Sequence, residues 1–158
     1  SDSIEALTEM LHEAYAPLAA AGMRFFASHQ SVDDTRRRMA RGDTIVGLDD
    51  ALLVGTITLA EAAHTAGCPH YDRPDVASVQ QFAVRPSHQR CGIGGQLLRL
   101  AERRAVETGA VHLALDTSER AGELIAMYER HGYRFVEHAQ WPDVNYRSVV
   151  LSKTFLSS

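Results

Sequence analysis

The sequence predicts an α/β fold, in which a mixed sheet is flanked by helices, and a strand–loop–helix unit at residues 77–105 is the main reason. The unit begins with Val79, Phe82 and Val84, which are apolar and favour strands. Apolar residues then recur at helical spacing over residues 93–105. A predicted hairpin precedes the unit, and a further strand and helix follow it. Because strands and helices are interleaved along the chain, the α/β class is favoured.

The chain before this unit contains two predicted helices. Residues 1–18 have one apolar face at helical spacing, and Pro17 and Gly22 are expected to end that helix. A second helix is expected to begin after Ser31, a favourable N-cap residue, and to stop at Gly42.

Two strand-favouring runs, residues 44–48 and 51–59, are separated by a short acidic turn and predict an antiparallel hairpin. The loop that follows, residues 61–75, is expected to lie over the sheet on the substrate side. Three potential zinc ligands lie in this loop: His64, Cys68 and His70. A closed zinc site needs four ligands, and no second cluster has matching spacing, so no metal site is predicted.

The chain after the central unit continues with a strand at residues 111–115 and a helix over residues 118–131, which Ser118 could cap. Two final strands are expected at residues 134–139 and 144–152. Because strand–helix–strand crossovers are right-handed, the strand at 111–115 is expected to pair in parallel with the central strand.

The segment that joins the central strand to its helix, residues 89–95, is called here the glycine loop. Glycines at such a junction let backbone amides approach a ligand without a Cβ in the way, and the helix dipole adds positive potential. A phosphate or pyrophosphate is therefore a candidate ligand, while a tight turn that merely uses glycine is the alternative. A P-loop is unsupported because no Gly-Lys-Ser/Thr follows, and Gly92-x-Gly94 lacks the third glycine of a dinucleotide fingerprint.

Two motifs together resemble those of the GCN5-related N-acetyltransferase (GNAT) superfamily. Gln89-x-x-Gly92-x-Gly94, directly after Phe82-Ala83-Val84-Arg85-Pro86, resembles the acyl-CoA signature, and Met127-Tyr128-Glu129-Arg130-His131-Gly132-Tyr133 is similar to the tyrosine-containing helix end. The resemblance covers residues 44–153. It implies a mostly antiparallel twisted sheet flanked by helices, with a central βα acyl-CoA-binding unit and a splayed parallel strand pair. The family's usual first strand is not visible in residues 1–158, which are read as a single N-acetyltransferase domain.

The resemblance implies acetyl transfer from acetyl-CoA to a primary amine by direct attack in a ternary complex, without a metal. Pantetheine is expected to pair with the central strand, and the pyrophosphate to lie on amides of the glycine loop. The implied cofactor-binding residues are Phe82, Ala83, Val84, Gln89, Arg90, Cys91, Gly92, Ile93, Gly94, Gly95 and Ser118. Tyr128 is implied as the general acid that protonates the leaving sulfur, while a core tyrosine sharing a helix face with Leu124 is the alternative.

Two positions depart from the family pattern. Family members often carry a Glu base on the central strand, where this chain has Gln80 and Gln81, and an amide cannot take up a proton at neutral pH. The base is therefore unassigned, and three residues are candidates only by expected proximity: Glu61, Asp75 and His138. A cofactor-contacting Asn is replaced by Ala121, with Ser118 as the nearest polar residue. Cys91 is read as a small filler of the loop, or else as a thiol activated by the helix terminus.

The composition of the chain indicates which kinds of partner and which cellular compartment to expect. Hydrophobic and charged contents of 45% and 23% are ordinary for a soluble globular chain, and neither a bilayer-spanning run nor a secretory signal pattern is present. Two isolated cysteines fit a reducing cytoplasm. The net charge of −4 argues against nucleic acid as a partner, and the consecutive arginines at 36–38 are expected to form a solvated helix face. No membrane partner is expected, and a homodimer is one option for the oligomeric state.

The predicted function is acetyl transfer to an amine of a small molecule or peptide that the sequence does not identify. The loop at 61–75, the first two helices and the turn at 140–143 are expected to contact this acceptor. The alternative is a non-catalytic binding module for acyl-CoA or a nucleotide phosphate. The amides at Gln80 and Gln81 favour that alternative, whereas Tyr128 favours the enzyme.

Overall fold

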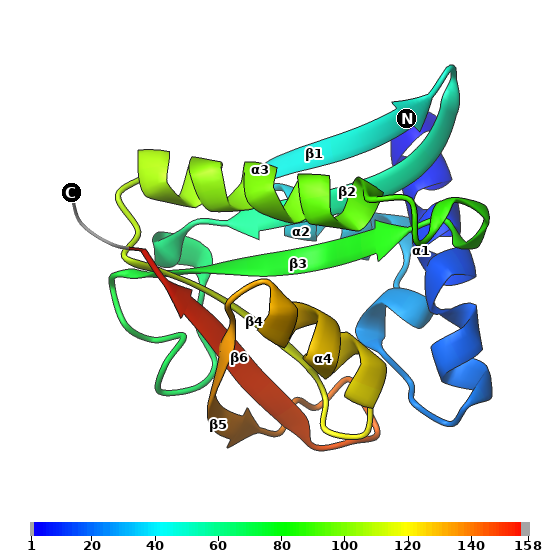
Figure 1. Cartoon of the computed structure of the whole chain (residues 1–158). Coiled ribbons are helices and arrows are strands. Elements are labelled where there is room, and N and C mark those ends of the chain that lie inside the picture. Colours follow the sequence, from blue (N-terminus) through cyan, green and yellow to red (C-terminus); the bar gives the residue numbers. More distant parts are fainter. Residues whose placement is uncertain (1, 156–158) are drawn as a thin grey trace.

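The computed structural model describes residues 2–155, which form a six-stranded sheet flanked by helices (Figure 1). The helices are α1 (Asp2–Ala20), α2 (Val32–Met39), α3 (Ile93–Glu107) and α4 (Gly122–Arg130). The strands are β1 (Gly42–Asp49), β2 (Leu52–Ala60), β3 (Val76–Val84), β4 (His112–Ser118), β5 (Arg134–Ala139) and β6 (Ser148–Thr154). Short 3₁₀ turns, η1 (Phe26–Ser28), η2 (Ala62–His64) and η3 (Pro86–His88), lie between them.

The strand order is β1-β2-β3-β4-β6-β5, and β3 with β4 is the parallel pair. These two strands pair only at residues 76–78 with 112–114. Beyond that point they diverge, so that residues 79–84 of β3 and 115–118 of β4 have no partner in each other (Figure 1). The predicted α/β class with a splayed parallel pair is confirmed. The antiparallel hairpin of β1 and β2 is confirmed as well.

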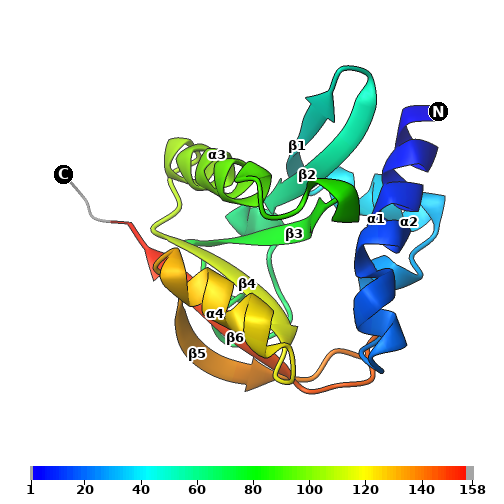
Figure 2. The ribbon, with the colours of Figure 1, turned by 45° about the vertical axis from the view of Figure 1, so that its right-hand side comes forward.

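The sheet separates two layers of helices. Helices α1 and α2 lie on one side, and α3 and α4 lie on the other (Figure 2). The α3 side is apolar: Leu97, Leu98 and Ala101 pack against buried strand residues such as Ile57 and Leu113. Burial of this apolar surface is the main stabilising contribution on that side.

The opposite side of the sheet contains a chain of buried hydrogen bonds. The Thr58 hydroxyl accepts from the Gln81 amide (2.9 Å), whose oxygen accepts from the Gln30 amide (2.7 Å). Gln30 also donates to the Thr35 hydroxyl (2.7 Å), which lies 2.6 Å from the Thr8 hydroxyl. Because buried polar groups are costly unless they are paired, this chain of bonds fixes α1 and α2 relative to β2 and β3.

The predicted start of the second helix is confirmed by its cap. The Ser31 hydroxyl accepts from the Asp34 amide, and the Asp34 carboxylate accepts from the Ser31 amide, which is a complete capping box. The predicted stop at Gly42 is wrong, because α2 ends at Met39 and Gly42 opens β1. A Cβ at Gly42 would lie 1.8 Å from the Leu59 carbonyl oxygen, so close strand pairing explains this glycine.

Three other boundaries differ from the prediction. Pro17 does not end α1, which continues to Ala20, while Gly22 follows with a φ of 92°. Ser118 is the last residue of β4 rather than a helix cap, and α4 begins at Gly122 without a side-chain cap. The final strand covers 148–154 instead of 144–152, because the turn after β5 is longer than expected. Residue 1 of the first predicted helix lies outside the described residues.

Candidate active site

The glycine loop adopts the tight geometry that its glycines allow. Gly92 is the N-cap of α3 with a φ of 88°, and Arg90 also has a positive φ, of 66°. The Gln89 side-chain amide donates to the Val84 carbonyl oxygen (3.0 Å) and holds the loop on the end of β3. Cys91 is exposed, and its thiol donates to the His88 carbonyl oxygen (2.6 Å).

The backbone amides of residues 90–95 are available to a ligand. Within residues 2–155, none of them donates to a backbone or side-chain acceptor, while the amide of Gln96 is the first to bond back, to Gly92. A Cβ at Gly94 would lie 3.6 Å from both the Phe82 and the Val84 side chains, which is an ordinary contact distance, so packing against β3 alone does not require glycine there. Unpaired amides at the positive end of a helix form an anion site.

A β-bulge distorts β3 beside the gap. The register with β2 shifts between Thr56 and Thr58, opposite residues 80–83, and Gln81 has a φ of 51°. Such a conformation is strained for a residue with a side chain. The two hydrogen bonds of the Gln81 amide, to Thr58 and from Gln30, hold it in place. Gln81 therefore has a structural role at the position where a base was sought.

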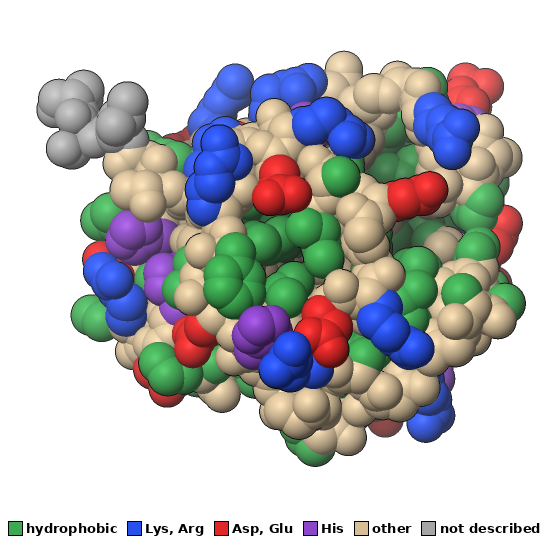
Figure 3. All heavy atoms as spheres, turned by 60° about the horizontal axis from the view of Figure 1, so that its bottom comes forward, with side chains coloured by type: hydrophobic (Ala, Val, Ile, Leu, Met, Phe, Trp, Pro, Cys, Tyr) green, Lys and Arg blue, Asp and Glu red, His purple; other side chains and the backbone are tan. Residues whose placement is uncertain are grey.

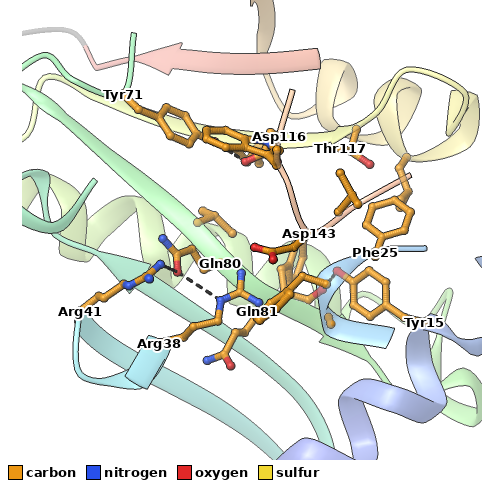
Figure 4. Close-up of a pocket in the computed structure, with 18 of the residues that line it drawn as sticks. Tyr15, Phe25, Arg38, Arg41, Tyr71, Gln80, Gln81, Asp116, Thr117 and Asp143 are labelled. Atoms are coloured by element: carbon orange, nitrogen blue, oxygen red, sulfur yellow. Dashed lines mark hydrogen bonds between the residues drawn. The ribbon is translucent and has the colours of Figure 1, made fainter. Parts of the chain in front are cut away.

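A hollow of about 410 Å³, called here the central cavity, opens between the diverging strands (Figure 4). It is lined by side chains from α1, α2, β3, β4 and α4 and from connecting segments at residues 25–27, 41, 64–71 and 141–146. The lining side chains include Tyr15, Phe25, Phe26, Arg38, Arg41, Tyr71, Gln80, Gln81, Asp116, Tyr128, Trp141, Asp143 and Tyr146. The regions expected to contact the acceptor, namely the first two helices, the loop at 61–75 and the turn at 140–143, all contribute to this wall.

Tyr128 lies in the wall of the central cavity. Its ring is buried against Phe82 and Tyr133, each with a centroid distance of 6.2 Å. Within the described residues, its hydroxyl has no hydrogen-bond partner. Burial raises the pKa of the Tyr128 phenol well above its usual value, with smaller contributions from Tyr15 and Asp116. The side chain thus combines a packed ring with a neutral hydroxyl next to the cavity.

Two carboxylates line the cavity, Asp143 in the turn after β5 and Asp116 on β4, and Asp116 faces it from the opposite strand. Its two oxygens accept hydrogen bonds from the Tyr71 hydroxyl (2.6 Å) and the Trp141 indole (2.9 Å), whose rings stack on each other at 5.8 Å. Burial raises the pKa of Asp116, while the two hydrogen bonds and Arg38 act in the opposite direction. A carboxylate with a raised pKa is a better proton acceptor than an exposed one.

Two arginines enter the cavity from the α2 side (Figure 4). Arg38 donates to the Gln30 side-chain oxygen (2.8 Å), and Arg41 donates to the Gln80 side-chain oxygen (3.0 Å). The guanidinium of Arg38 also lies over the Phe26 ring at 5.2 Å. The expected solvated face is thus wrong for Arg38, because the third arginine of the run turns inward.

The three base candidates suggested by proximity do not line the central cavity. Glu61 is exposed beside η2, Asp75 pairs with Arg73, and His138 lies 3.8 Å from Glu119. Ser118 is fully buried at the end of β4, and its hydroxyl accepts from the Arg120 amide (3.1 Å). Its predicted cofactor contact stays a prediction.

The zinc candidates do not assemble into a site. Within residues 2–155, no group of three or more His, Cys, Asp or Glu side chains could hold a metal ion. The His70 Nε2 atom instead lies 2.9 Å from the Ser152 hydroxyl, and Cys68 is buried in a small apolar cluster.

Among the described helices, none has the length and apolar character needed to cross a bilayer. The face in Figure 3 has a hollow with hydrophobic side chains inside it and both signs of charge around it.

The sequence did not predict that Asp116, Arg38, Arg41 and Tyr15 line the central cavity. Asp116 has a recognisable signal, since it is a charged residue within an apolar strand. Arg38 and Arg41 have a weaker one, since their spacing of three residues brings side chains to one helical face. Tyr15 has none, because its hydroxyl bond to the Phe82 carbonyl oxygen (2.6 Å) depends on tertiary packing.

Comparisons with known proteins agree with this geometry. The model of the acetyltransferase (GNAT) family matches residues 5–133. The S-(2-succino)cysteine N-acetyltransferase of Bacillus subtilis (strain 168) is 32% identical over 135 residues, which are 82% of this chain and 77% of that protein.

Solved structures share the fold at low sequence identity. The ribosomal-protein-S18-alanine N-acetyltransferase of Escherichia coli has a TM-score of 0.73 at 16% identity, covering 100% of this chain and 91% of that one. A GNAT family acetyltransferase from Elizabethkingia anophelis with acetyl-CoA bound has a TM-score of 0.62 at 16% identity, covering 79% and 84%. The family match favours the enzyme over the non-catalytic binding module. The chain therefore belongs to the GNAT family and is an acetyl-CoA-dependent N-acetyltransferase.

Proposed function

We propose that this enzyme acetylates the primary amine of a small molecule, by direct attack on acetyl-CoA inside the central cavity. The observation that carries the proposal is the position of the cavity between the two diverging strands, with the Tyr128 hydroxyl in its wall. The glycine loop follows the end of the same β3, so a thioester lying along the unpaired edge of β3 would have its acetyl group at the cavity.

The proposed binding of acetyl-CoA, the acetyl donor, is supported by the backbone amides of the glycine loop. The pyrophosphate of coenzyme A would accept hydrogen bonds from amides of residues 90–95, which have no partner in the described chain. Pantetheine would pair with backbone amides on the edge of residues 82–84 that faces away from β2, where the Phe82 and Val84 carbonyl oxygens already accept from Tyr15 and Gln89. Both contacts position the thioester without a charged side chain, so positioning alone supplies part of the rate.

The proposed reaction of the acceptor amine is supported by the position of Asp116. An amine arrives at neutral pH as an ammonium ion, which cannot attack a carbonyl carbon. Asp116 would accept one proton from it, since its carboxylate faces the cavity and its pKa is raised by burial. The hydrogen bonds from Tyr71 and Trp141 fix the orientation of the carboxylate for this transfer.

The bonds and protons of the transfer reaction balance when Tyr128 acts as the general acid. The nitrogen–carbon bond forms as the amine attacks, and the carbon–sulfur bond breaks as the tetrahedral intermediate collapses. The Tyr128 phenol gives its proton to the departing thiolate. Overall the ammonium loses two protons: one reaches solvent through Asp116, and the second replaces the proton that Tyr128 gave up.

The acceptor class is also supported by a relative. GNAT enzymes act on small-molecule or protein amines, and the Bacillus subtilis relative is named for S-(2-succino)cysteine, a small molecule with an amine. A partly enclosed cavity of about 410 Å³ suits an acceptor of that size better than a folded protein surface.

Tyr128→Phe tests the proposal, because it keeps the ring against Phe82 and Tyr133 and removes only the hydroxyl. Loss of a positioned general acid typically costs ~10²–10⁴-fold, so kcat should fall by about that factor while KM for acetyl-CoA changes little. Release of free coenzyme A thiol with a panel of amines provides the measurement. An unchanged kcat, with chemistry shown to be rate-limiting, would return Tyr128 to a packing role.

A further inference from the structure

Two cations in the central cavity have no carboxylate partner. The side chains of Arg38 and Arg41 are partly buried, and both donate to the side-chain oxygen of Gln80, at 3.4 Å and 3.0 Å. The second contact of Arg38 is the amide oxygen of Gln30. Within residues 2–155, no Asp or Glu side chain pairs with either guanidinium. Both guanidinium groups therefore donate their hydrogen bonds to neutral amide oxygens.

The neighbouring arginines of α2 are arranged differently. Arg36 pairs with Asp33 at 2.8 Å on the exposed side of the helix, and Arg37, which is exposed but also lines the cavity, pairs with Asp34 at 2.8 Å. The carboxylates of α2 thus neutralise Arg36 and Arg37, whereas Arg38 and Arg41 have no such partner among the described residues. Removing a cation from water is costly unless an anion compensates, and burial lowers the pKa of Arg38 to about 10. A ligand with a negative group would supply that compensation.

This positive region is separate from the phosphate site. Gln80 lies near the middle of β3, whereas the glycine loop follows the end of β3 at Val84. At ~3.3 Å per residue, the strand between these points spans roughly 13 Å. The pyrophosphate of coenzyme A on the loop would therefore leave Arg38 and Arg41 without an anion. An anionic group of the acceptor would supply that anion.

The cavity carries opposite charges on its two walls. Arg38 and Arg41 extend from one wall, and Asp116 lies on the other, with Tyr71 beside it (Figure 4). Asp143 also lines the cavity but forms no ion pair with either arginine within the described residues. A compact ligand with an ammonium at one end and a carboxylate at the other matches both walls at once. The planar guanidinium groups can each donate two parallel hydrogen bonds to a carboxylate.

We propose that the acceptor is a free amino acid or a closely related amino carboxylate, whose carboxylate is bound by Arg38 and Arg41 and whose amine faces Asp116. The proposal rests on the proposed function, because it places the reacting amine in the same cavity. It deepens that function by assigning two specificity-determining residues on α2 and the segment that follows it.

The test compares L-amino acids with their carboxamides, which have nearly the same size but lack the negative charge. Coenzyme A thiol release should give kcat/KM values about 10- to 100-fold higher for the accepted acids than for their amides, the range expected for a hydrogen bond to a charged group. Arg41→Gln and Arg38→Gln should abolish most of this preference by lowering kcat/KM for the acids alone. Arg36→Gln, an exposed arginine of the same helix, is the matched control and should keep the preference.

Two results would overturn the carboxylate site. The first is equal turnover of acids and amides by the unmodified enzyme, or of peptides whose carboxylates lie far from the amine. The second is an unchanged preference in both Arg41→Gln and Arg38→Gln. Because Arg38 also bonds to the buried Gln30, the Arg38→Gln variant could unfold. In that case the carboxylate site is tested by Arg41→Gln and by inhibition of the unmodified enzyme with succinate. Succinate should compete with the amine and not with acetyl-CoA, whereas succinamide should not compete; equal inhibition by the two would contradict the site.

Calorimetry separates a failure of this proposal from a failure of the proposed function. With coenzyme A present, amino acids should bind the unmodified protein and bind Arg41→Gln about 10-fold or more weakly. That binding result together with no thiol release would support the carboxylate site and overturn only the proposed transfer reaction. Thiol release with no preference for carboxylates would support the reaction and overturn only the site.

Discussion

The glycine loop and the central cavity lie next to each other along β3, but they are built in different ways. The glycine loop presents backbone amides from a short continuous segment, residues 90–95. The central cavity presents side chains brought together from α1, α2, β3, β4, α4 and the connecting loops. The first depends on local backbone conformation, whereas the second depends on how distant elements pack.

This difference separates the two substrates of the enzyme. A pyrophosphate can be recognised by amides that every sequence carries, provided that the turn and helix terminus have the right geometry. An acceptor has to be distinguished by charge and shape, which need particular side chains, and Asp116 and Arg38 are the ones proposed here. Changes in the glycine loop should therefore affect the donor, and changes in the cavity should affect the acceptor.

Asp116→Asn should have the largest effect on the acceptor side. Removing the proton acceptor should lower kcat/KM for the amine by about 10²-fold at pH 7. The pKa of Asp116 is raised by burial, so the acid limb of the unmodified enzyme should lie above the range of an ordinary Asp. The variant should instead keep gaining activity toward the pKa of the amine itself, ~10, because only an amine that arrives neutral can then react. A pH profile of kcat/KM measures both limbs.

The control for Asp116 is Tyr71→Phe, which removes one hydrogen bond to the carboxylate and keeps the carboxylate itself. Its pH profile should keep an acid limb, and its loss of activity should be much smaller. If Asp116→Asn lost no more activity than Tyr71→Phe at every pH, Asp116 would have only a structural role.

Gly92→Val should act on the donor side. A Cβ at Gly92 would meet no protein atom within 4 Å, so the substitution would not disturb the packing of the chain itself. The φ of 88° is the source of the effect, since left-handed backbone costs roughly 1–2 kcal/mol for a residue with a Cβ. Distortion of the loop amides should weaken coenzyme A binding by about 5- to 30-fold in calorimetry, with the amine KM little changed.

Gly109→Val provides the matched control at the other end of α3. Gly109 has a φ of 90°, and a Cβ there would likewise meet nothing within 4 Å. This variant should lose similar thermal stability but keep its affinity for coenzyme A. Equal loss of coenzyme A affinity in both variants would mean that the effect comes from general destabilisation of α3.

Trp141→Ala should affect the acceptor more than the donor. The Trp141 indole donates to Asp116, and its ring stacks on Tyr71. Loss of about 1 kcal/mol of positioning should raise KM for the amine roughly 3- to 10-fold, with a smaller change for acetyl-CoA. Steady-state kinetics with each substrate varied in turn gives both constants. A larger change for acetyl-CoA would contradict the division between the two regions.

The same division explains what the sequence could predict. The glycine loop, the Ser31 cap and the strand at 134–139 depend on short-range signals, namely turn residues, capping residues and periodicity, and all three elements were found where expected. The inward turn of Arg38 was not, because it depends on Gln30 and Gln80, which come from other parts of the chain. The bulge at Gln81 was not predicted either, since its strain is offset by buried partners that only tertiary packing brings together.

Ser31→Ala should give the smallest effect and tests whether the cavity depends on the stability of α2. The Ser31 hydroxyl caps the Asp34 amide at 3.0 Å, and loss of such a cap costs ~1 kcal/mol. For a chain of this size, the midpoint of thermal unfolding should fall by roughly 2–4 °C. Because α2 carries Arg38 near its end and the buried Thr35–Gln30 bond anchors the helix, fraying of the first turn should leave Arg38 in place. KM for the amine should then rise by less than about twofold, the change that a few tenths of a kcal/mol produces, with KM for acetyl-CoA unchanged.

The control is Ser87→Ala, at an exposed serine whose hydroxyl contacts the neighbouring His88. This variant should change neither the midpoint of thermal unfolding nor KM for the amine. A rise in amine KM as large as that of Trp141→Ala would mean that the arginine side of the cavity is held by the cap of α2 rather than by the buried hydrogen bonds beneath it.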